Sequence, residues 1–350
     1  MKDLRSLNLE EMEELLKDLG EPSFRAKQLF QWVHNKGIGS LEEISNFSKS
    51  LIEKLGQVVS LTPLTVATRQ VSKDGTVKYL LSLEDKSYIE CVLMSYQGTK
   101  SKNRNTLCIS SQVGCAMGCG FCATGKGGFQ RNLTAGEILD QVYAVTRLEK
   151  WNNEDFKIGN IVYMGMGEPL INFDNVIKSI NILNHPLGQN IGIRRITVST
   201  CGIVPKIREL ALYELDIVLA ISLHAPTDEL RSEIMPINDK YPLKQLKEAC
   251  IYYIENTNRR ITFEYALIEG FNDKIKLAYK LAEFLRGMKC HVNLIPVNKV
   301  GEDGFNRPTK ARIESFHKEL VKLGIEASIR EEKGVDIDAA CGQLRGKMLK

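Results

Sequence analysis

The 350-residue sequence predicts an α/β protein with a small helical domain in front of it. From residue 106 onward, short apolar runs with strand periodicity alternate with helical patterns, which is typical of repeated βα units and a parallel sheet. Residues 6–59 show only helical periodicity. The sheet is either open and doubly wound or a full or partial barrel. In both cases ligands bind at the carboxyl ends of the strands.

The N-terminal region predicts three helices with Gly or Pro between them. In each helix, apolar residues recur at spacings of three and four. The expected bounds are Leu7–Leu19, Phe24–Asn35 and Phe47–Val59. Phe30 and Trp32 are interpreted as core residues rather than as a surface for stacking bases. Residues 1–60 are therefore expected to form a helical accessory domain.

A change to strand periodicity at Thr65 predicts a β connector over residues 61–96. Its expected strands are Val66–Val71, Thr76–Leu83 and Ser87–Met94. Asp74-Gly75 lies between the first two and is a strong hairpin signal. Residues 97–350 make up the third predicted domain, an α/β core with a C-terminal tail.

The core is expected to contain seven strands. They are Thr106–Ser110, Ile158–Met164, Arg195–Ser199, Ile217–Leu223, Ile261–Ala266, His291–Pro296 and Glu326–Arg330. A capping box of Thr134 and Glu137 predicts the start of the first core helix. Several strands end in small or polar residues, which can converge on one pocket. Each such residue taken alone also fits an ordinary strand terminator.

Three cysteines lie within eight residues at the spacing C-x3-C-x2-C: Cys115, Cys119 and Cys122. A tight loop with Gly118 and Gly120 can bring their thiols together. Iron–sulfur clusters are usually held by four cysteine thiolates, and three ligands leave one iron open, as a catalytic zinc keeps an open position. The alternatives are a structural zinc site or three loosely placed thiols, but no His or fourth Cys lies close by in the sequence.

The composition, 43% hydrophobic and 26% charged, is typical of a soluble protein. The N-terminus lacks the basic start and apolar run of a signal peptide, and no apolar segment reaches the length of a bilayer. We therefore predict a cytoplasmic location without membrane attachment. Thiols stay reduced there, so the nine cysteines are expected to be ligands, reactants or core residues rather than disulfides.

Basic residues concentrate near the cysteine loop. Residues 1–60 contain eight basic and ten acidic side chains, whereas residues 61–134 contain nine basic and four acidic ones. This distribution suits a polyanionic substrate such as nucleic acid, although a solvated loop explains it almost as well. The basic residues around the loop are Lys100, Lys102, Arg104, Lys126 and Arg131.

These features together resemble the radical S-adenosylmethionine (SAM) superfamily. More closely, the sequence is similar to the bacterial adenine-C2 methyltransferases that modify 23S ribosomal RNA and transfer RNA, over nearly the whole chain. Besides the cysteine loop, the shared motifs are SSQVGC at 110–115, MGMGEPL at 164–170, MPIN at 235–238, HVNLIP at 291–296 and ACGQL at 340–344.

Two other classes of protein stay open as alternatives. One is the related family that methylates C8 of the same ribosomal adenosine and confers antibiotic resistance, although residues 167–170 and 199–202 resemble the C2 enzymes more. The other is a non-catalytic iron–sulfur or zinc protein that binds RNA.

The resemblance implies a partial (β/α)6-type radical SAM barrel, with a helical RNA-binding domain and a short β-hairpin extension. Cys115, Cys119 and Cys122 would ligate one 4Fe-4S cluster. Cys341 would carry the methyl group, with Cys108 as its resolving partner and Glu90 as the proton acceptor. The residues expected to contact SAM are Gly167, Glu168, Ser199, Ser222, Leu223, His224 and Asn298.

The implied reaction suits the electron-poor C2 carbon, which has no lone pair to attack a methylsulfonium. One SAM methylates Cys341, and a second, cleaved by an electron from the cluster, gives a radical that takes hydrogen from that methyl group. The methylene radical adds to adenosine in the peptidyl transferase centre of 23S rRNA, or 3′ of the tRNA anticodon. Cys108 then resolves the transient protein–RNA intermediate, which leaves a disulfide to be reduced. A monomer that uses an external electron donor such as flavodoxin is expected.

Overall fold

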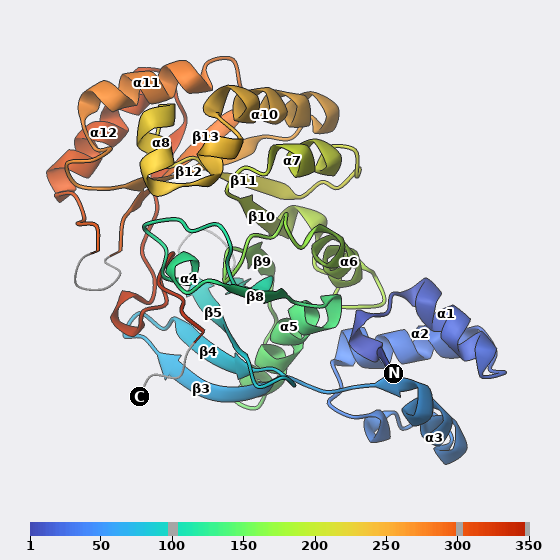
Figure 1. The fold of residues 1–350 in the computed structure, drawn as a ribbon. Helices are drawn as coiled ribbons and strands as arrows, with labels where there is room; N and C mark the ends of the chain where they lie inside the picture. The colour runs from blue at the N-terminus through green and yellow to red at the C-terminus, as the bar shows by residue number, and fades with distance from the viewer. Residues whose placement is uncertain (97–103, 299–303, 347–350) are drawn as a thin grey trace.

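Ten strands form one continuous sheet in the computed structural model, which describes residues 1–96, 104–298 and 304–346 (Figure 1). Their order across the sheet is β14-β13-β12-β11-β10-β9-β6-β5-β4-β3. The seven strands from β6 to β14 pair in parallel, whereas β3, β4, β5 and β6 pair antiparallel. The bounds are β3 (Thr65–Val71), β4 (Val77–Ser82), β5 (Tyr88–Tyr96), β6 (Arg104–Cys108), β9 (Asn160–Tyr163), β10 (Ile196–Thr200), β11 (Val218–Ser222), β12 (Ile261–Leu267), β13 (Cys290–Pro296) and β14 (Ala327–Ile329).

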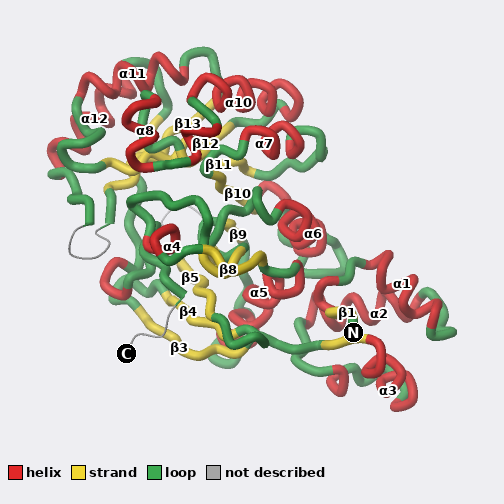
Figure 2. The backbone as a smooth tube through the Cα atoms, in the orientation of Figure 1, coloured by secondary structure: helices red, strands yellow, loops and turns green. Residues whose placement is uncertain are grey.

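The parallel part of the sheet is a partial barrel. Its strands follow each other in chain order, whereas a doubly wound sheet reverses that order. Helices outside the sheet make the connections (Figure 2). These helices are α5 (Ala135–Lys150), α6 (Phe173–Asn184), α7 (Val204–Leu210), α8 (Asp228–Ile234), α9 (Ile237–Lys240), α10 (Leu243–Thr257), α11 (Ile275–Leu285) and α12 (Lys310–Lys322), whereas the short α4 (Ala123–Lys126) follows the cysteine loop. The barrel stays open, since β14 and β3 are the two edges of the sheet.

The seven predicted core strands are confirmed, each within a few residues of its expected bounds. The capping box that starts α5 is confirmed as well. The Glu137 amide donates to Thr134 Oγ1 over 3.1 Å, and the Thr134 amide donates to the Glu137 carboxylate over 2.9 Å. The connector strands β3, β4 and β5 continue the sheet of the core, as the predicted hairpin extension requires. The domain bounds at residues 60 and 96 stay predictions.

The N-terminal region contains the three predicted helices, with one difference. The predicted helix Phe24–Asn35 is α-helical only to Phe30 and continues as a wider π-helical turn, Gln31–Lys36. This turn contains His34, which lies 2.8 Å from the Tyr143 hydroxyl and 2.9 Å from the Leu7 carbonyl. Tyr143 belongs to α5, so the wider turn joins the N-terminal helices to the core. The elements here are β1 (Lys2–Asp3), α1 (Leu9–Asp18), α2 (Phe24–Phe30), α3 (Lys49–Val58), β2 (Val59–Ser60) and 3-10 helices at Leu4–Ser6 and Leu41–Glu43.

Two further segments approach the carboxyl ends of the barrel strands. A separate two-stranded sheet, β7 (Gln112–Gly114) and β8 (Phe129–Asn132), flanks the cysteine loop. The C-terminal tail, residues 330–346, contains one 3-10 helix, Val335–Ile337, and returns beside β3, β4 and α4 (Figure 1).

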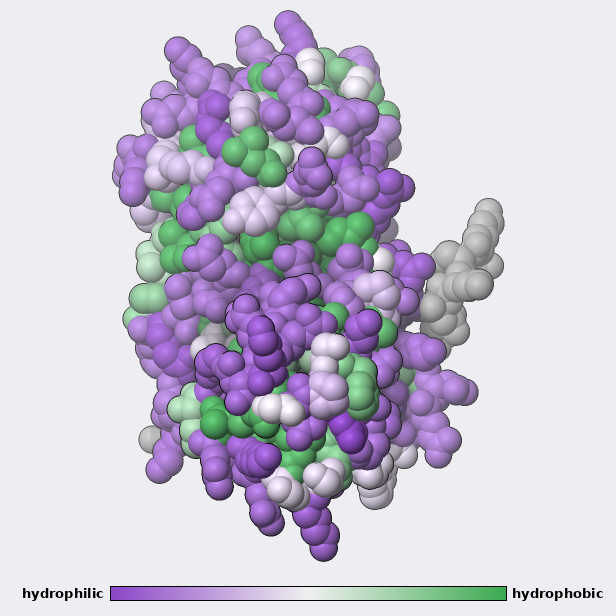
Figure 3. Space-filling view, turned by 90° about the vertical axis from the view of Figure 1, so that its right-hand side faces the viewer, coloured by the Kyte–Doolittle hydropathy of each residue, from purple (hydrophilic) through white to green (hydrophobic). Residues whose placement is uncertain are grey.

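The face of the molecule in Figure 3 is largely hydrophilic, with apolar side chains gathered in a band across its middle. Within the described part of the chain, we find no helix with the length and apolar character needed to cross a bilayer.

Candidate active site

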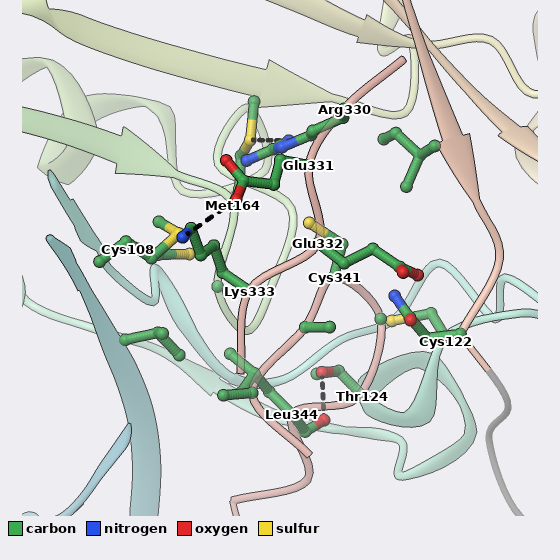
Figure 4. A pocket seen from close by; sticks show the side chains of 18 of the residues that line it. Cys108, Cys122, Thr124, Met164, Arg330, Glu331, Glu332, Lys333, Cys341 and Leu344 are labelled. Carbon is green, nitrogen blue, oxygen red and sulfur yellow. Dashed lines mark hydrogen bonds and ion pairs between the residues drawn. The ribbon is translucent and has the colours of Figure 1, made fainter. Parts of the chain in front are cut away.

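Two adjoining cavities open at the carboxyl ends of the barrel strands. The cysteine-loop cavity is lined by residues 115–122 and by the ends of the strands from β9 to β13. The tail cavity is lined by Cys108 at the end of β6 and by residues of the tail (Figure 4). Cys122, Arg330 and Cys341 line both cavities. The site therefore combines the cysteine loop with the C-terminal tail, which lies about 200 residues further along the chain.

Most of the predicted site residues come together here. Leu223 is fully buried, and its amide donates to the Glu264 carbonyl over 3.0 Å. Cys108 lines the tail cavity. Glu90 is not among the described residues that line either cavity. The predicted residues that line the cysteine-loop cavity are Cys115, Cys119, Cys122, Gly167, Glu168, Ser199, Ser222, His224, Asn298 and Cys341.

The cysteine loop is held mainly by backbone contacts. A Cβ at Gly114 would lie 2.0 Å from the Gly128 carbonyl oxygen, so only glycine permits the close approach of β7 to β8. Further along, the Gly120 amide donates to the Ile234 carbonyl over 2.9 Å. Burial, with repulsion from Glu168, raises the pKa of Cys115 to about 11.

The donor set of the loop suits a cluster. All three thiols line one cavity, yet among the described residues no group of three or more His, Cys, Asp or Glu side chains is placed to hold a metal ion. A single ion needs its ligands to converge on one point. A 4Fe-4S cluster distributes its cysteine ligands over different irons, so the three sulfurs need not converge.

A buried carboxylate lies at the end of β9. Glu168 Oε2 accepts from the Cys201 amide over 2.7 Å, and its Oε1 accepts from the Leu170 amide over 3.1 Å. Burial raises the pKa of Glu168 in spite of these bonds. Gly167 beside it has φ of +101°, and a Cβ there would lie 2.5 Å from the Gln112 side chain. Glycine thus lets this turn pack directly on β7.

A neutral imidazole lies at the end of β11. His224 has φ of +58°, and its Nδ1 accepts from the Ala266 amide over 2.9 Å. Burial lowers the pKa of His224 to about 3, so the ring is neutral and Nε2 carries its proton. The ring packs edge-on against Phe121 of the cysteine loop, with centroids 4.6 Å apart.

Sequence reasoning missed Arg231, which ties the strand ends together below the loop. This fully buried side chain donates from Nη2 to the Cys201 carbonyl over 2.6 Å and from Nε to the Leu223 carbonyl over 3.1 Å. Its Nη1 donates to Asn238 Oδ1 over 3.0 Å. Because α8 also supplies the Ile234 carbonyl to the cysteine loop, Arg231 links the loop to β10 and β11. The MPIN motif four residues later was the available signal.

Arg330 and Glu264 were also missed. Arg330 follows β14 and lies 3.8 Å from Glu264 Oε2 and 3.8 Å from the Met164 sulfur (Figure 4). The negative charge of a Cys341 thiolate raises the pKa of Arg330. A permanent cation therefore lies beside the two predicted reactive thiols, of which buried Cys108 has its pKa raised to about 12.

The tail accepts hydrogen bonds from α4, the helix that follows Cys122. The Gly342 carbonyl accepts from the Ala123 amide over 2.7 Å, and the Leu344 carbonyl accepts from Thr124 Oγ1 over 2.7 Å (Figure 4). Ala123 follows Cys122 in the chain. The exposed Cys341 is thereby placed next to the cysteine loop.

Glu90 faces the tail rather than either cavity. Its Oε1 lies 3.3 Å from Lys78 Nζ, and its Oε2 accepts from the amides of Arg345 and Gly346 over 2.5 and 2.9 Å. The role of Glu90 as a proton acceptor stays a prediction, and in this structure its carboxylate is already bonded.

The predicted basic surface is only partly available to phosphates. Arg131 pairs with Asp85 over 2.7 Å and with Glu137 over 2.8 Å. The Arg104 guanidinium lies over the Tyr96 ring, 4.7 Å from its centroid, and Lys126 is exposed. Lys100 and Lys102 lie outside the described residues. Of the cysteines without a predicted role, Cys91, Cys201 and Cys250 are buried and Cys290 is partly buried, and Cys201 also lines the cysteine-loop cavity.

Known proteins similar to this chain cover its whole length. The family model of the radical SAM superfamily matches residues 109–282, and that of the ribosomal RNA large subunit methyltransferase N-terminal domain matches residues 2–61. A "probable dual-specificity RNA methyltransferase RlmN" of Caldanaerobacter subterraneus subsp. tengcongensis is 51% identical, with 100% of this chain and 99% of the relative covered. The protein of that name from Alkaliphilus metalliredigens is also 51% identical, over 99% and 95%.

A solved structure extends this similarity to the fold. The crystal structure of a radical SAM methyltransferase from Sphaerobacter thermophilus matches with a TM-score of 0.93 and 45% identity. The match covers 99% of this chain and 100% of that one.

Proposed function

Since this chain belongs to the RlmN family of dual-specificity RNA methyltransferases, we propose that it methylates C2 of adenosine in 23S ribosomal RNA and in transfer RNA. The observation that carries the proposal is the position of Cys341, which lines both cavities. The thiol can thus meet a cofactor above the barrel strands and then Cys108 at the end of β6.

The cysteine-loop cavity is the proposed cofactor site. Cys115, Cys119 and Cys122 would hold one 4Fe-4S cluster, which together with SAM supplies one-electron chemistry when bound. Glu168 offers a buried carboxylate for a cationic amino group, and His224 offers a neutral N–H donor. The other proposed contacts are Gly167, Ser199, Ser222, Leu223 and Asn298.

Cys341 is the proposed methyl carrier. A thiolate is the nucleophilic form of cysteine, and Cys341 lines the same two cavities as the Arg330 cation. Covalent catalysis through this sulfur divides one difficult transfer into two steps. We propose two SAM per turnover, because methylating Cys341 and activating the attached methyl group each consume one.

Cys108 is the proposed resolving residue. It lines the tail cavity with Cys341, and burial keeps its thiol protonated until it is needed. In the proposed step the Cys108 thiol loses its proton and its sulfur bonds to the Cys341 sulfur. The sulfur–carbon bond to the RNA adduct breaks, and its electron pair stays on the released methylene carbon, which takes up a proton to become the methyl group. The resulting disulfide must be reduced before another turnover. Removal of the C2 proton is proposed for Glu90, after its carboxylate has left the tail amides.

The C2 position is proposed over C8 because the relatives carry the dual-specificity name and the C2 motifs at 167–170 and 199–202 are present. Mass spectrometry of nucleosides from RNA treated with the enzyme tests this choice directly. We expect 2-methyladenosine, and 8-methyladenosine would instead indicate the antibiotic-resistance type of enzyme. A non-catalytic RNA-binding protein would release no 5′-deoxyadenosine when supplied with SAM and a reductant.

The N-terminal helices are the proposed RNA-binding accessory, since the matched family domain covers residues 2–61. Arg104 and Lys126 are proposed phosphate contacts near the tail cavity. The external electron donor such as flavodoxin and the monomeric state stay predictions, as does the cytoplasmic location expected from the sequence composition.

A further inference from the structure

We propose that the buried ion pair of Lys78 and Glu90 positions Cys341 by holding the tail on both sides of that cysteine. We call this ion pair, together with its hydrogen bonds to the tail, the bracket. The role of the bracket in catalysis rests on the proposed function, in which Cys341 must reach Cys108. Its hydrogen bonds to the tail do not depend on that function.

The sheet register places the bracket on the same face as Cys108. Lys78 of β4 lies opposite Val92 of β5, and Val92 lies opposite Cys108 of β6. Glu90 is two residues before Val92, so its side chain points to the same face. Lys78 Nζ lies 3.3 Å from Glu90 Oε1, and each side chain is only 6% exposed. In this structure the buried pair thus lies on the face of the sheet that the tail covers.

Each member of the pair binds a different part of the tail. Lys78 Nζ donates to the Asp338 carbonyl over 3.2 Å, three residues before Cys341. Glu90 Oε2 accepts from the amides of Arg345 and Gly346, four and five residues after Cys341. The bracket therefore encloses one short segment, and Cys341 lies near its middle.

Gly346, at the end of this segment, packs closely against β5 and Met166. Gly346 has φ of +61°, and a Cβ there would lie 2.8 Å from the Tyr88 carbonyl oxygen and 2.5 Å from the Met166 side chain. No strand or α-helix is present in the described residues 330–346, so regular backbone hydrogen bonding does not hold this segment. Side-chain groups such as Glu90 supply the partners that its amides need.

A stabilising role alone does not account for a buried ion pair at this place. Taking two charges out of water costs several kcal/mol each, and well-packed apolar residues often replace such a pair without loss of stability. An apolar pair could not form the hydrogen bond to the Asp338 carbonyl or the two hydrogen bonds from the tail amides. We therefore assign the pair to positioning rather than to stability.

The test separates these two roles with the double variant K78M/E90L. In the cluster-loaded protein without RNA or SAM, the Cys108 and Cys341 thiols are equilibrated anaerobically with oxidised glutathione. Each disulfide formed reduces one oxidised glutathione to two thiols. Peptide mass spectrometry gives the equilibrium constant, and a thermal melt gives the stability.

We expect the double variant to melt within a few degrees of the wild-type protein, while its disulfide equilibrium constant falls at least tenfold. Trypsin cleavage in the tail should become faster to match. K73M is the matched control, because Lys73 contributes only its backbone amide to Asp336 and the equilibrium should not move. K78R, which keeps the cation, should recover most of the wild-type constant.

A folded double variant with a disulfide equilibrium within twofold of wild type would overturn the proposal. Should the double variant fail to fold, K78M gives the same decision, since it removes the bond to the Asp338 carbonyl before Cys341 and leaves the Glu90 bonds after it in place. None of these readouts needs methyl transfer, so a failure of the proposed RNA chemistry would be seen separately in the nucleoside analysis.

Discussion

The two sides of the proposed reaction site are built in different ways. The cysteine loop is fixed by backbone contacts, such as the Gly120 amide on the Ile234 carbonyl and the close approach at Gly114. The tail is fixed largely by side chains that reach it from distant elements, including Lys78 and Glu90. The proposed cofactor side is therefore a local motif on the barrel, whereas the proposed methyl-carrying side depends on a few long-range attachments.

Removal of the reactive thiol of the tail should change activity the most. Cys341→Ala should reduce methylated adenosine to background, because no sulfur remains to carry the methyl group. Iron content and the visible absorption of the cluster should match wild type, since the cysteine loop is held independently. Normal RNA product from this variant would contradict the division of roles between the two sides.

A similar loss of turnover is expected from Cys108→Ala, but here the reaction should stop at the covalent protein–RNA intermediate. Without the second thiol, the covalent link between Cys341 and RNA should persist and migrate as a protein–RNA crosslink on a denaturing gel. Cys250→Ala is the matched control, because this buried cysteine lies on α10 away from both cavity linings. Free methylated RNA at the wild-type rate from Cys108→Ala would argue against its resolving role.

A smaller effect is expected from the scaffold of the cofactor side. Arg231→Met removes the guanidinium donor from the carbonyls of Cys201 and Ser222, at about 1–3 kcal/mol each, whereas the Leu223 carbonyl keeps a bond from the Ala225 amide. The free energy of unfolding measured in urea should therefore fall by about 2 kcal/mol or more, and cluster loading should fall with it.

The control for Arg231→Met is Arg194→Met, whose exposed side chain pairs with Asp216. This change should cost about 1 kcal/mol or less. Equal stability of the two variants would show that Arg231 does not fasten the strand ends.

The stability should also depend on pH, in a way that differs between regions. Burial lowers the pKa of His34 and of His224 to about 3, from about 6.5 in the unfolded chain. Because the unfolded state binds these protons first, the free energy of unfolding should fall as the pH drops from 6.5 towards 3. The slope should be about 1.4 kcal/mol per pH unit for each histidine.

The tail attachment at Asp74 should respond only to stronger acid. Its partial burial acts to raise the pKa, but bonds from the Gly334 and Thr76 amides hold that pKa at about 2. The stabilisation that Asp74 contributes is therefore lost only as the pH falls from about 3.8 to 2.

Denaturant titrations at several pH values should show the loss of stability caused by the histidines first, and His34→Gln should remove half of that slope. An unchanged slope in that variant would contradict the assignment.

Local signals in the sequence predicted most of the fold. Alternating periodicity located the seven core strands, Asp74-Gly75 marked the hairpin, and Thr134 with Glu137 marked the start of α5. Each of these depends on neighbours in the chain. The partial barrel could not be separated from an open sheet by this means alone, because strand order is a long-range property. The π-helical turn at Gln31–Lys36 was missed for the same reason, since its contact with Tyr143 lies far along the sequence.

The candidate site was predictable where it consists of motifs, and not where it depends on partners. The cysteines of the loop and the strand-end residues were identified, and the structure brings most of them to one cavity. Arg231 has the sequence pattern of an ordinary helical surface residue, yet it is fully buried. The bonds of Lys78 and Glu90 to the tail span about 260 residues, and no pattern of spacing could predict them.

In the proposed reaction the methyl group reaches RNA through Cys341 in the tail. A pulse and chase with labelled SAM tests this route. The enzyme is first incubated with SAM that carries a deuterated methyl group, freed of that SAM, and then given RNA, reductant and unlabelled SAM for a single turnover. We predict deuterium on the Cys341 peptide after the pulse and in the 2-methyladenosine after the chase. An RNA product without deuterium in that first turnover would contradict the account.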